Sequence, residues 1–131
     1  MLIELPEPVS MIFDSPEFAT LATLQPDGQP HLSVVWVARD GHVLLMSTVR
    51  GRQKHRNLER DPRATVLVYP KANPYSYVEV RGTVTMTEQG GCELIDRLNL
   101  EYTGGDRYTM DDGTENIRVV IRLIPSKVIV L

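Results

Sequence analysis

The sequence predicts a mainly β domain in which six or seven mostly antiparallel strands close into a small barrel, with a few helices between them. Three observations support this prediction. Short apolar segments rich in β-branched residues recur along the 131 residues, and turn sequences separate the first of them. The helical segments are too few for regular alternation of strand and helix. A sheet of this kind hides its edges by closing on itself.

The N-terminal third predicts a short helix followed by three strands. The helix covers residues 8–14, and Pro16 prevents its continuation. Strands follow over 18–24 and 31–38, joined by a Pro-Asp-Gly turn, and a third strand covers 42–49 after a second tight turn. Because these strands are consecutive, we expect them to form an antiparallel meander.

The middle of the chain predicts a helix and two further strands. Good helix formers replace β-branched residues over 51–61, and Pro62 closes that segment. Strands are expected over 63–69 and 76–87, with a bulge or bend at Gly82 in the second of them.

The C-terminal third predicts the longest helix, a polar loop and the last strands. The helix covers 88–102, the loop 106–115, and one or two strands 117–131, interrupted at Pro125. Apolar residues at helical spacing are expected to face the core from that helix: Cys92, Ile95, Leu98 and Tyr102. We expect the loop to be either an ordinary surface loop or a lid near the site of a partner subunit.

Composition limits the class of protein. A formal charge of −3, with 42% hydrophobic and 24% charged residues, is typical of one globular domain, which we expect to cover residues 1–131. One cysteine excludes a disulfide framework, and three scattered histidines give no metal-ligand spacing, so no metal site is expected. The acidic N-terminal segment does not resemble a secretory signal, and no apolar run reaches the roughly 20 residues of a membrane helix. We therefore expect a cytoplasmic protein.

Basic residues gather in one short stretch of an otherwise acidic chain. Five of the fourteen Lys and Arg residues lie within residues 50–60, where Glu59 is the one acid, which leaves nine bases and sixteen acids elsewhere. The five are Arg50, Arg52, Lys54, Arg56 and Arg60. A local cluster favours an anion site over nucleic-acid binding, which usually needs an extended positive face. A solvated helix face is the alternative interpretation.

The stretch from Ser47 to Lys54 brings hydroxyls, a glycine, the start of a helix and two cations together. The first amides of a helix lack intrahelical partners and lie at the positive end of its dipole, so they bind anions. Arg52 and Lys54 would add charge-assisted hydrogen bonds to a phosphate. Neither a Walker A sequence nor G-x-G-x-x-G is present, which argues against a nucleoside triphosphate or a Rossmann-bound dinucleotide.

The chain also resembles the flavin and deazaflavin split-barrel proteins related to pyridoxamine 5′-phosphate oxidase. Four groups of residues carry the resemblance in order: Ala19-Thr20-Leu21-Ala22-Thr23-Leu24, Pro26-Asp27-Gly28-Gln29-Pro30-His31, Arg52-Gln53-Lys54 with Asn57-Leu58 and Asp61-Pro62-Arg63-Ala64, and Glu79-Val80-Arg81-Gly82. The R-x-K sequence followed by N-L and D-P-R-A is most similar to the branch that uses coenzyme F420, a deazaflavin with a phosphate and an oligoglutamate tail. The resemblance implies a split β-barrel and a homodimer with its cofactor groove between the subunits.

The resemblance also implies a set of cofactor-binding residues. It implies that Arg52 and Lys54 contact the cofactor phosphate, and that residues 31–35 lie along the ring. The positions it assigns are Ser47, Thr48, Arg52, Gln53, Lys54, His31, Ser33, Val34, Val35, Asn57 and Tyr77. No catalytic side chain is assigned, because solvent can protonate the product of such a reaction.

The function that the resemblance implies is hydride transfer from reduced F420 to a planar, electron-poor acceptor such as a quinone or a tetrapyrrole. The acidic tail of F420 suits the basic stretch better than the shorter FMN does. Two alternatives stay open: an FMN-binding flavin reductase or oxidase of the same fold, and a non-catalytic F420-binding protein. We expect no nucleic-acid or membrane partner.

Overall fold

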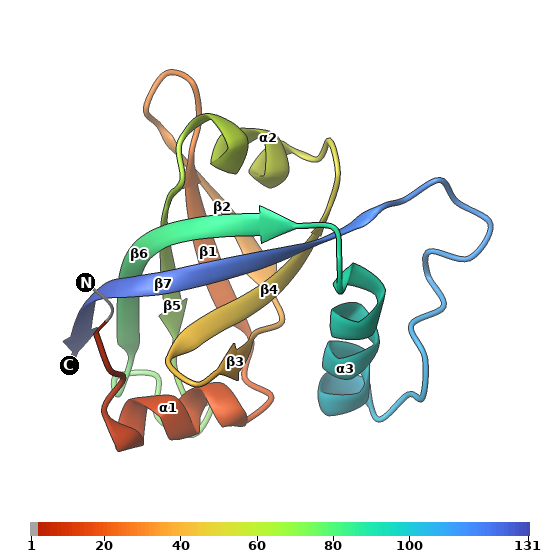
Figure 1. Cartoon of the computed structure of the whole chain (residues 1–131). Helices are drawn as coiled ribbons and strands as arrows, with labels where there is room; N and C mark the ends of the chain where they lie inside the picture. The colour runs from red at the N-terminus through yellow and green to blue at the C-terminus, as the bar shows by residue number, and fades with distance from the viewer. Residues whose placement is uncertain (1–2) are drawn as a thin grey trace.

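A seven-stranded antiparallel sheet in the order β2-β1-β5-β6-β7-β4-β3 forms the body of the protein in a computed structural model, which describes residues 3–131 (Figure 1). The strands are β1 (Ala19–Leu24), β2 (Pro30–Val35), β3 (Ala38–Asp40), β4 (Val43–Val49), β5 (Arg63–Val68), β6 (Val78–Thr87) and β7 (Arg118–Val130). The helices are α1 (Glu7–Asp14), α2 (Gln53–Arg60) and α3 (Gly91–Thr103). The fold is mainly β, and its sheet curls into a split barrel. This confirms the predicted fold class.

The barrel is filled by the inward-facing side chains of its strands. Leu21 of β1, Val66 of β5, Val80 of β6 and Ile121 of β7 are fully buried, in agreement with the period-two alternation that a half-buried strand requires. Phe13 of α1, 2% exposed, packs into the same core. The strands thus provide a rigid frame from which the loops and helices project.

The three helices cover different parts of the barrel. Figure 1 shows α1 and α2 at opposite ends of the barrel, with α3 beside it. Leu58 of α2 belongs to the main core, whereas Leu94 and Leu98 of α3 pack with Leu45 of β4 and Val120 of β7 in a second, smaller cluster. This second cluster attaches α3 to the outside of the barrel.

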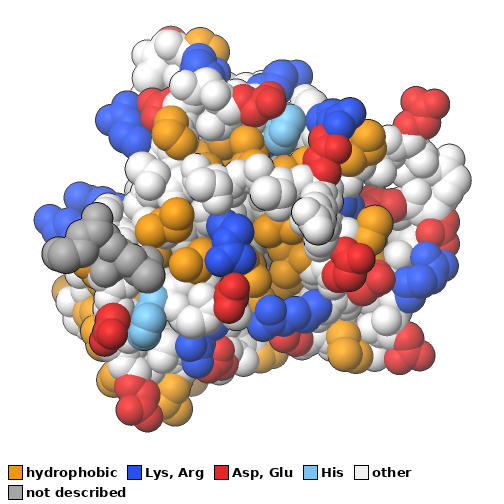
Figure 2. All heavy atoms as spheres, viewed as in Figure 1, with side chains coloured by type: hydrophobic (Ala, Val, Ile, Leu, Met, Phe, Trp, Pro, Cys, Tyr) orange, Lys and Arg blue, Asp and Glu red, His pale blue; other side chains and the backbone are white. Residues whose placement is uncertain are grey.

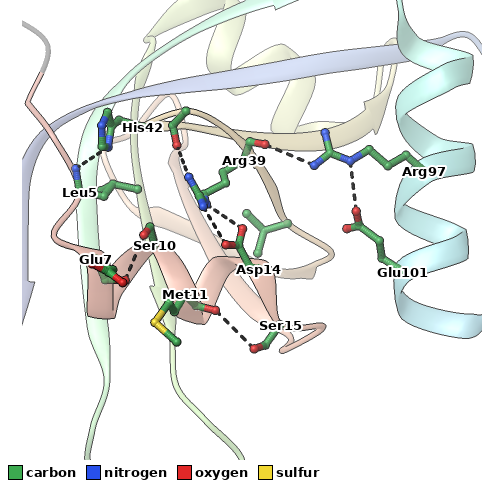
Figure 3. A network of polar contacts seen from close by, with 12 residues as sticks. Leu5, Glu7, Ser10, Met11, Asp14, Ser15, Arg39, His42, Arg97 and Glu101 are labelled. Atoms are coloured by element: carbon green, nitrogen blue, oxygen red, sulfur yellow. Dashed lines mark hydrogen bonds and ion pairs between the residues drawn. The ribbon is translucent and has the colours of Figure 1, made fainter.

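Polar contacts tie α1 and α3 to β3 (Figure 3). Arg39 of β3 donates two hydrogen bonds of 2.7 Å to the Asp14 carboxylate at the end of α1. Arg97 of α3 donates to the Arg39 carbonyl and to Glu101. Arg39 holds the pKa of Asp14 below its ordinary value. These exposed contacts fix orientation more than they add stability.

Two predictions for the first strands are wrong. The segment 31–38 is not one strand, because β2 ends at Val35 and β3 starts at Ala38. Between them the Val37 N–H donates to the Tyr102 hydroxyl of α3, which itself donates to the Glu17 carbonyl. The expected three-stranded meander is also absent from the described residues, since β4 pairs with β3 and β7 and not with β2.

The later elements differ from the prediction at Pro125 and Cys92 and agree with it at Gly82. Strand β7 runs without a break through Pro125. This residue lies two positions beyond Leu123, the last one paired with β4, so β7 has a neighbour on one side only there. The predicted irregularity at Gly82 is confirmed by a register shift between Arg81 and Gly82. Cys92 is exposed on α3, and Leu94 occupies the core-facing position instead.

The face of the molecule in Figure 2 carries interspersed acidic and basic side chains, without a continuous positive surface. Within residues 3–131, the structure has no helix that is both long and apolar enough to cross a membrane. In the same range, His, Cys, Asp and Glu side chains do not gather in the groups of three that could hold a metal ion.

Candidate functional site

A cavity of about 210 Å³ lies where the barrel, the start of α2 and α3 meet. The barrel contributes Val34, Val35, Ser47 and Thr48, together with Trp36 from the β2–β3 connection. The remaining lining residues are Phe18, Arg52, Lys54, Ile95, Leu98, Tyr108 and Arg118. The cavity therefore has apolar and aromatic walls with cationic groups on part of its surface.

A second hollow of about 380 Å³ adjoins this cavity. Arg52 and Lys54 line both spaces, so the two hollows meet at the start of α2. The second hollow is otherwise lined by His31, Ser33, Gly51, Gln53 and Arg56. Nine of the eleven residues that the family resemblance assigned to cofactor binding line one or both of these adjoining hollows, which together are called the groove below.

The local sequence explains how the two cations reach the groove. Strand β4 ends at Val49, and Gly51 has φ of +88°, a left-handed conformation that favours glycine. The Gly51 N–H donates to Nδ1 of His55 at 3.0 Å, which fixes the turn to the first residues of α2. Among residues 3–131 no side chain caps the start of α2, so its first amides remain available to an anion beside Arg52 and Lys54.

The five basic residues of this stretch have different environments. Arg50 pairs with Glu88, Arg56 donates to the Gly51 carbonyl and to Gln53, and Arg60 donates to the Leu24 carbonyl. Within residues 3–131, Arg52, Lys54, Arg56 and Arg60 form no ion pair with a carboxylate, whereas Arg50 does. Of these four, Arg52 and Lys54 are the two that line both hollows of the groove.

Lys54 is the more unusual of the two cations. Its Nζ donates to Ser33 Oγ at 3.2 Å, a neutral partner. Burial lowers the pKa of the Lys54 ammonium, and the nearby positive charges of Arg52 and Arg118 lower it further. An anion placed between these groups would be favoured by all three charges.

Two buried polar atoms in the groove lack hydrogen-bond partners in the part of the chain that the structure describes. They are Thr48 Oγ1, in a side chain only 1% exposed, and His31 Nδ1. Buried polar groups are almost always satisfied in folded proteins, because an unmade hydrogen bond costs about 1–3 kcal/mol. Both atoms are therefore suited to contact a polar ligand.

The aromatic wall of the cavity is built around Trp36. Its ring stacks on Tyr102 with centroids 5.3 Å apart and an interplanar angle of 16°, and it meets Tyr108 edge-on at 6.3 Å. Tyr102 is anchored in turn by the hydroxyl contacts described above. Such a wall suits a planar, largely apolar group.

The structure adds Tyr108 and Arg118 to the site, which the sequence did not assign to it. Arg118 begins β7 and lies beside the end of β4, where Val49 is its ladder partner. Its guanidinium pairs with Asp111 at 2.6 Å in the loop after α3. No local motif marks Arg118, and only the β4–β7 pairing brings it to the groove.

Two assigned residues do not line the groove. Asn57 is fully buried, and its side-chain amide donates to Thr23 Oγ1 and Gln25 Oε1 and accepts from Gln53. It holds α2 on the barrel. Tyr77 directly precedes β6, and its carbonyl accepts a hydrogen bond from the Leu131 N–H.

The fold and the groove define a small barrel domain suited to a ligand that combines an anionic group with a planar ring. Comparison with known families is consistent with this class. The chain belongs to the pyridoxamine 5′-phosphate oxidase family, whose model matches residues 5–128. The resemblance inferred from the sequence is thus confirmed.

Solved structures extend the comparison. One described as an F420 reductase is 32% identical to this chain, with a TM-score of 0.84 over 95% of this chain and 98% of that one. A conserved hypothetical protein from Mycobacterium tuberculosis is 27% identical, with a TM-score of 0.74 over 97% and 84% of the two chains. General Stress Protein 26 from Bacillus anthracis shares the fold at 20% identity and a TM-score of 0.72, over 95% and 92%. The likeness to an F420 reductase suggests an oxidoreductase.

Proposed function

We propose that this protein is an F420-dependent oxidoreductase that reduces a planar, electron-poor acceptor of the quinone or tetrapyrrole type. The observation that carries the proposal is the pair of cations, Arg52 and Lys54, that line both hollows at a helix start, without carboxylate partners or a side-chain cap among the described residues. The likeness to an F420 reductase supports the choice of a deazaflavin.

The residues present fit such a cofactor. A phosphate at the start of α2 would accept hydrogen bonds from helix amides, Arg52 and Lys54. Thr48 Oγ1 and His31 Nδ1, buried and without partners among the described residues, offer two more polar contacts. The second hollow extends this positive region past Arg52 toward Arg56, which suits an acidic tail.

The protein's contribution to the reaction is binding, orientation and exclusion of water. When bound, reduced F420 supplies the hydride. Arg52 and Lys54 anchor the anionic part of the ligand, and Val34, Val35 and Trp36 provide apolar surface for the planar groups. Solvent can supply the proton that completes reduction of the acceptor, so the proposed reaction needs no dedicated acid. Positioning of the two reactants accounts for catalysis.

A comparison of two cofactors tests the proposal. The purified protein is dialysed to equilibrium against F420 and, separately, against FMN, and oxidation of reduced F420 is then followed with menadione as acceptor. Micromolar binding of F420, weaker binding of FMN and turnover are expected. Preference for FMN would assign the protein to the flavin branch, and F420 binding without turnover across several quinones would make it a carrier.

The affinity for F420 should fall at alkaline pH. Because burial lowers the pKa of Lys54, its ammonium loses its proton at a less alkaline pH than an exposed lysine, whose pKa is about 10.4. Only the protonated Lys54 side chain attracts an anion, and a bound anion in turn raises the pKa of Lys54. Lys54→Arg should retain affinity to higher pH, since guanidinium stays charged. Equilibrium dialysis over a pH series measures this, and identical pH profiles for the two proteins would contradict it.

We also propose that two copies associate through the outer surface of β2 and β1. Leu32 and Val34 of β2 are 63% and 70% exposed, and they lie opposite Ala22 and Thr20 of β1. Exposed apolar side chains on an edge strand favour association. Since Val34 also lines the cavity, a second copy would border the site.

Light scattering after size exclusion tests the association. A dimer is expected for the wild type and a monomer for Leu32→Glu, which places a charge on the proposed contact. Thr85→Glu, on an exposed position of β6, should remain a dimer. A monomeric wild type, or a dimeric Leu32→Glu variant, would refute this arrangement.

A further inference from the structure

The loop between α3 and β7 supplies one wall of the cavity through Tyr108. Figure 1 shows this segment leaving the end of α3 and returning to the start of β7. The Tyr108 N–H donates to Asp96 of α3 at 2.8 Å, and the ring meets Trp36 edge-on. The loop is therefore attached both to α3 and to the aromatic wall.

Arg118 fixes the other side of Tyr108. Its Nη2 donates to the Tyr108 hydroxyl at 3.2 Å, and its guanidinium carbon lies 4.8 Å from the centre of the Tyr108 ring. The same guanidinium makes two hydrogen bonds to the Asp111 carboxylate, of 2.6 and 3.1 Å. One buried cation thus contacts both the ring and the turn of the loop.

The charges around Arg118 explain why it pairs with Asp111 and not with the neighbouring Asp112. The Arg118 side chain is 8% exposed, and a buried guanidinium is costly unless a carboxylate compensates it. Asp111 is that carboxylate, and it also accepts from the Asn116 side chain. Asp112, the next residue, pairs instead with Arg107, and both of those side chains are more than half exposed. Two adjacent acids of one loop therefore differ sharply in environment.

We propose that Tyr108 is a specificity-determining residue that limits the size of the acceptor, with Arg118 and Asp111 as the positioning residues that hold its ring in the cavity wall. This inference rests on the proposed oxidoreductase function for the acceptor, but the contacts that build the wall all lie within one chain. A smaller side chain at residue 108, or a loop released from Arg118, would extend the cavity and admit larger ring systems.

The first experiment needs no cofactor. Trp36 is the one tryptophan, so quenching of its fluorescence by acrylamide reports how well the wall covers it. Tyr108→Ala and Asp111→Asn should both raise the quenching constant, whereas Tyr108→Phe, which keeps the ring, and Asp112→Asn should leave it near the wild-type value. Equal quenching in Asp111→Asn and Asp112→Asn would overturn the positioning role. Tyr108→Leu serves if the alanine variant does not fold.

The second experiment measures acceptor choice. Values of kcat/KM are compared for 1,4-benzoquinone, 1,4-naphthoquinone and 9,10-anthraquinone-2-sulfonate, which have one, two and three rings. Tyr108→Ala should shift the preference toward the three-ring acceptor by about tenfold, with Asp111→Asn shifted in the same direction. An unchanged preference would overturn the specificity role. The dissociation constant for F420 is measured in parallel, so a wild type that fails to bind F420 refutes the proposed function and not the wall.

Discussion

We expect the double variant Arg52→Ala, Lys54→Ala to bind F420 about 100-fold more weakly than the wild type, or worse. Hydrogen bonds to charged groups contribute about 1.5–3 kcal/mol each, and a 100-fold loss corresponds to about 2.7 kcal/mol. Both side chains lack carboxylate partners within the described chain, so their charge is available to the ligand. Equilibrium dialysis measures the change directly.

Arg50→Ala is the matched control for this experiment. Arg50 belongs to the same basic stretch and carries the same charge, but Glu88 already compensates it. Its removal should change the affinity by less than about threefold, as expected for an exposed, paired charge. If both variants lost affinity equally, the net charge of the stretch would matter more than the position of the two cations, and the assigned anion site would be wrong.

Gly82→Ala should destabilise the fold by about 3 kcal/mol, because a small-to-large change in a packed strand forces the backbone apart. A Cβ atom at this position would lie 2.1 Å from the Ile124 carbonyl oxygen of β7 and 3.1 Å from the Leu123 side chain. Backbone atoms cannot move aside as a flexible side chain can. The free energy of unfolding in urea measures this effect.

Thr83→Ala provides the comparison for Gly82. Residue 83 is the next one on β6 and points outward, so its truncation should change the free energy of unfolding by no more than about 0.5 kcal/mol. A Gly82→Ala variant as stable as the wild type would mean that the bulge between β6 and β7 can relax. The close approach of Gly82 to the Ile124 carbonyl would then not require glycine at position 82.

The sequence predicts well those features that depend on neighbouring residues. The hairpin of β1 and β2, the start of α2 and the irregularity at Gly82 all follow from local turn and helix signals. The groove around Arg52 and Lys54 follows from the same local signals combined with a family resemblance. In these places the local preference and the fold agree.

The errors arise where distant segments decide the outcome. Arg118 and Ser47 both line the cavity although they are 71 positions apart, and no short motif connects them. The break after β2 depends on the Tyr102 hydroxyl, which comes from a helix much later in the chain. Cys92 shares the helical spacing of Ile95, but it lies outside the buried face of α3, which Leu94, Ile95 and Leu98 form. Periodicity identifies an apolar face without fixing its edges.

The place of β7 in the sheet makes it the strand that joins the two parts of the barrel. On one side lie β2, β1, β5 and β6, on the other lie β4 and β3, and β7 is the strand that hydrogen-bonds to both groups. The hairpins β1–β2 and β3–β4 close over short loops. The pairing of β4 with β7, by contrast, joins residues far apart in the sequence, such as Leu44 and Leu123. Closing long loops before gaining contacts slows folding. The groove, whose walls come from both groups, is therefore complete only when β7 has paired with both.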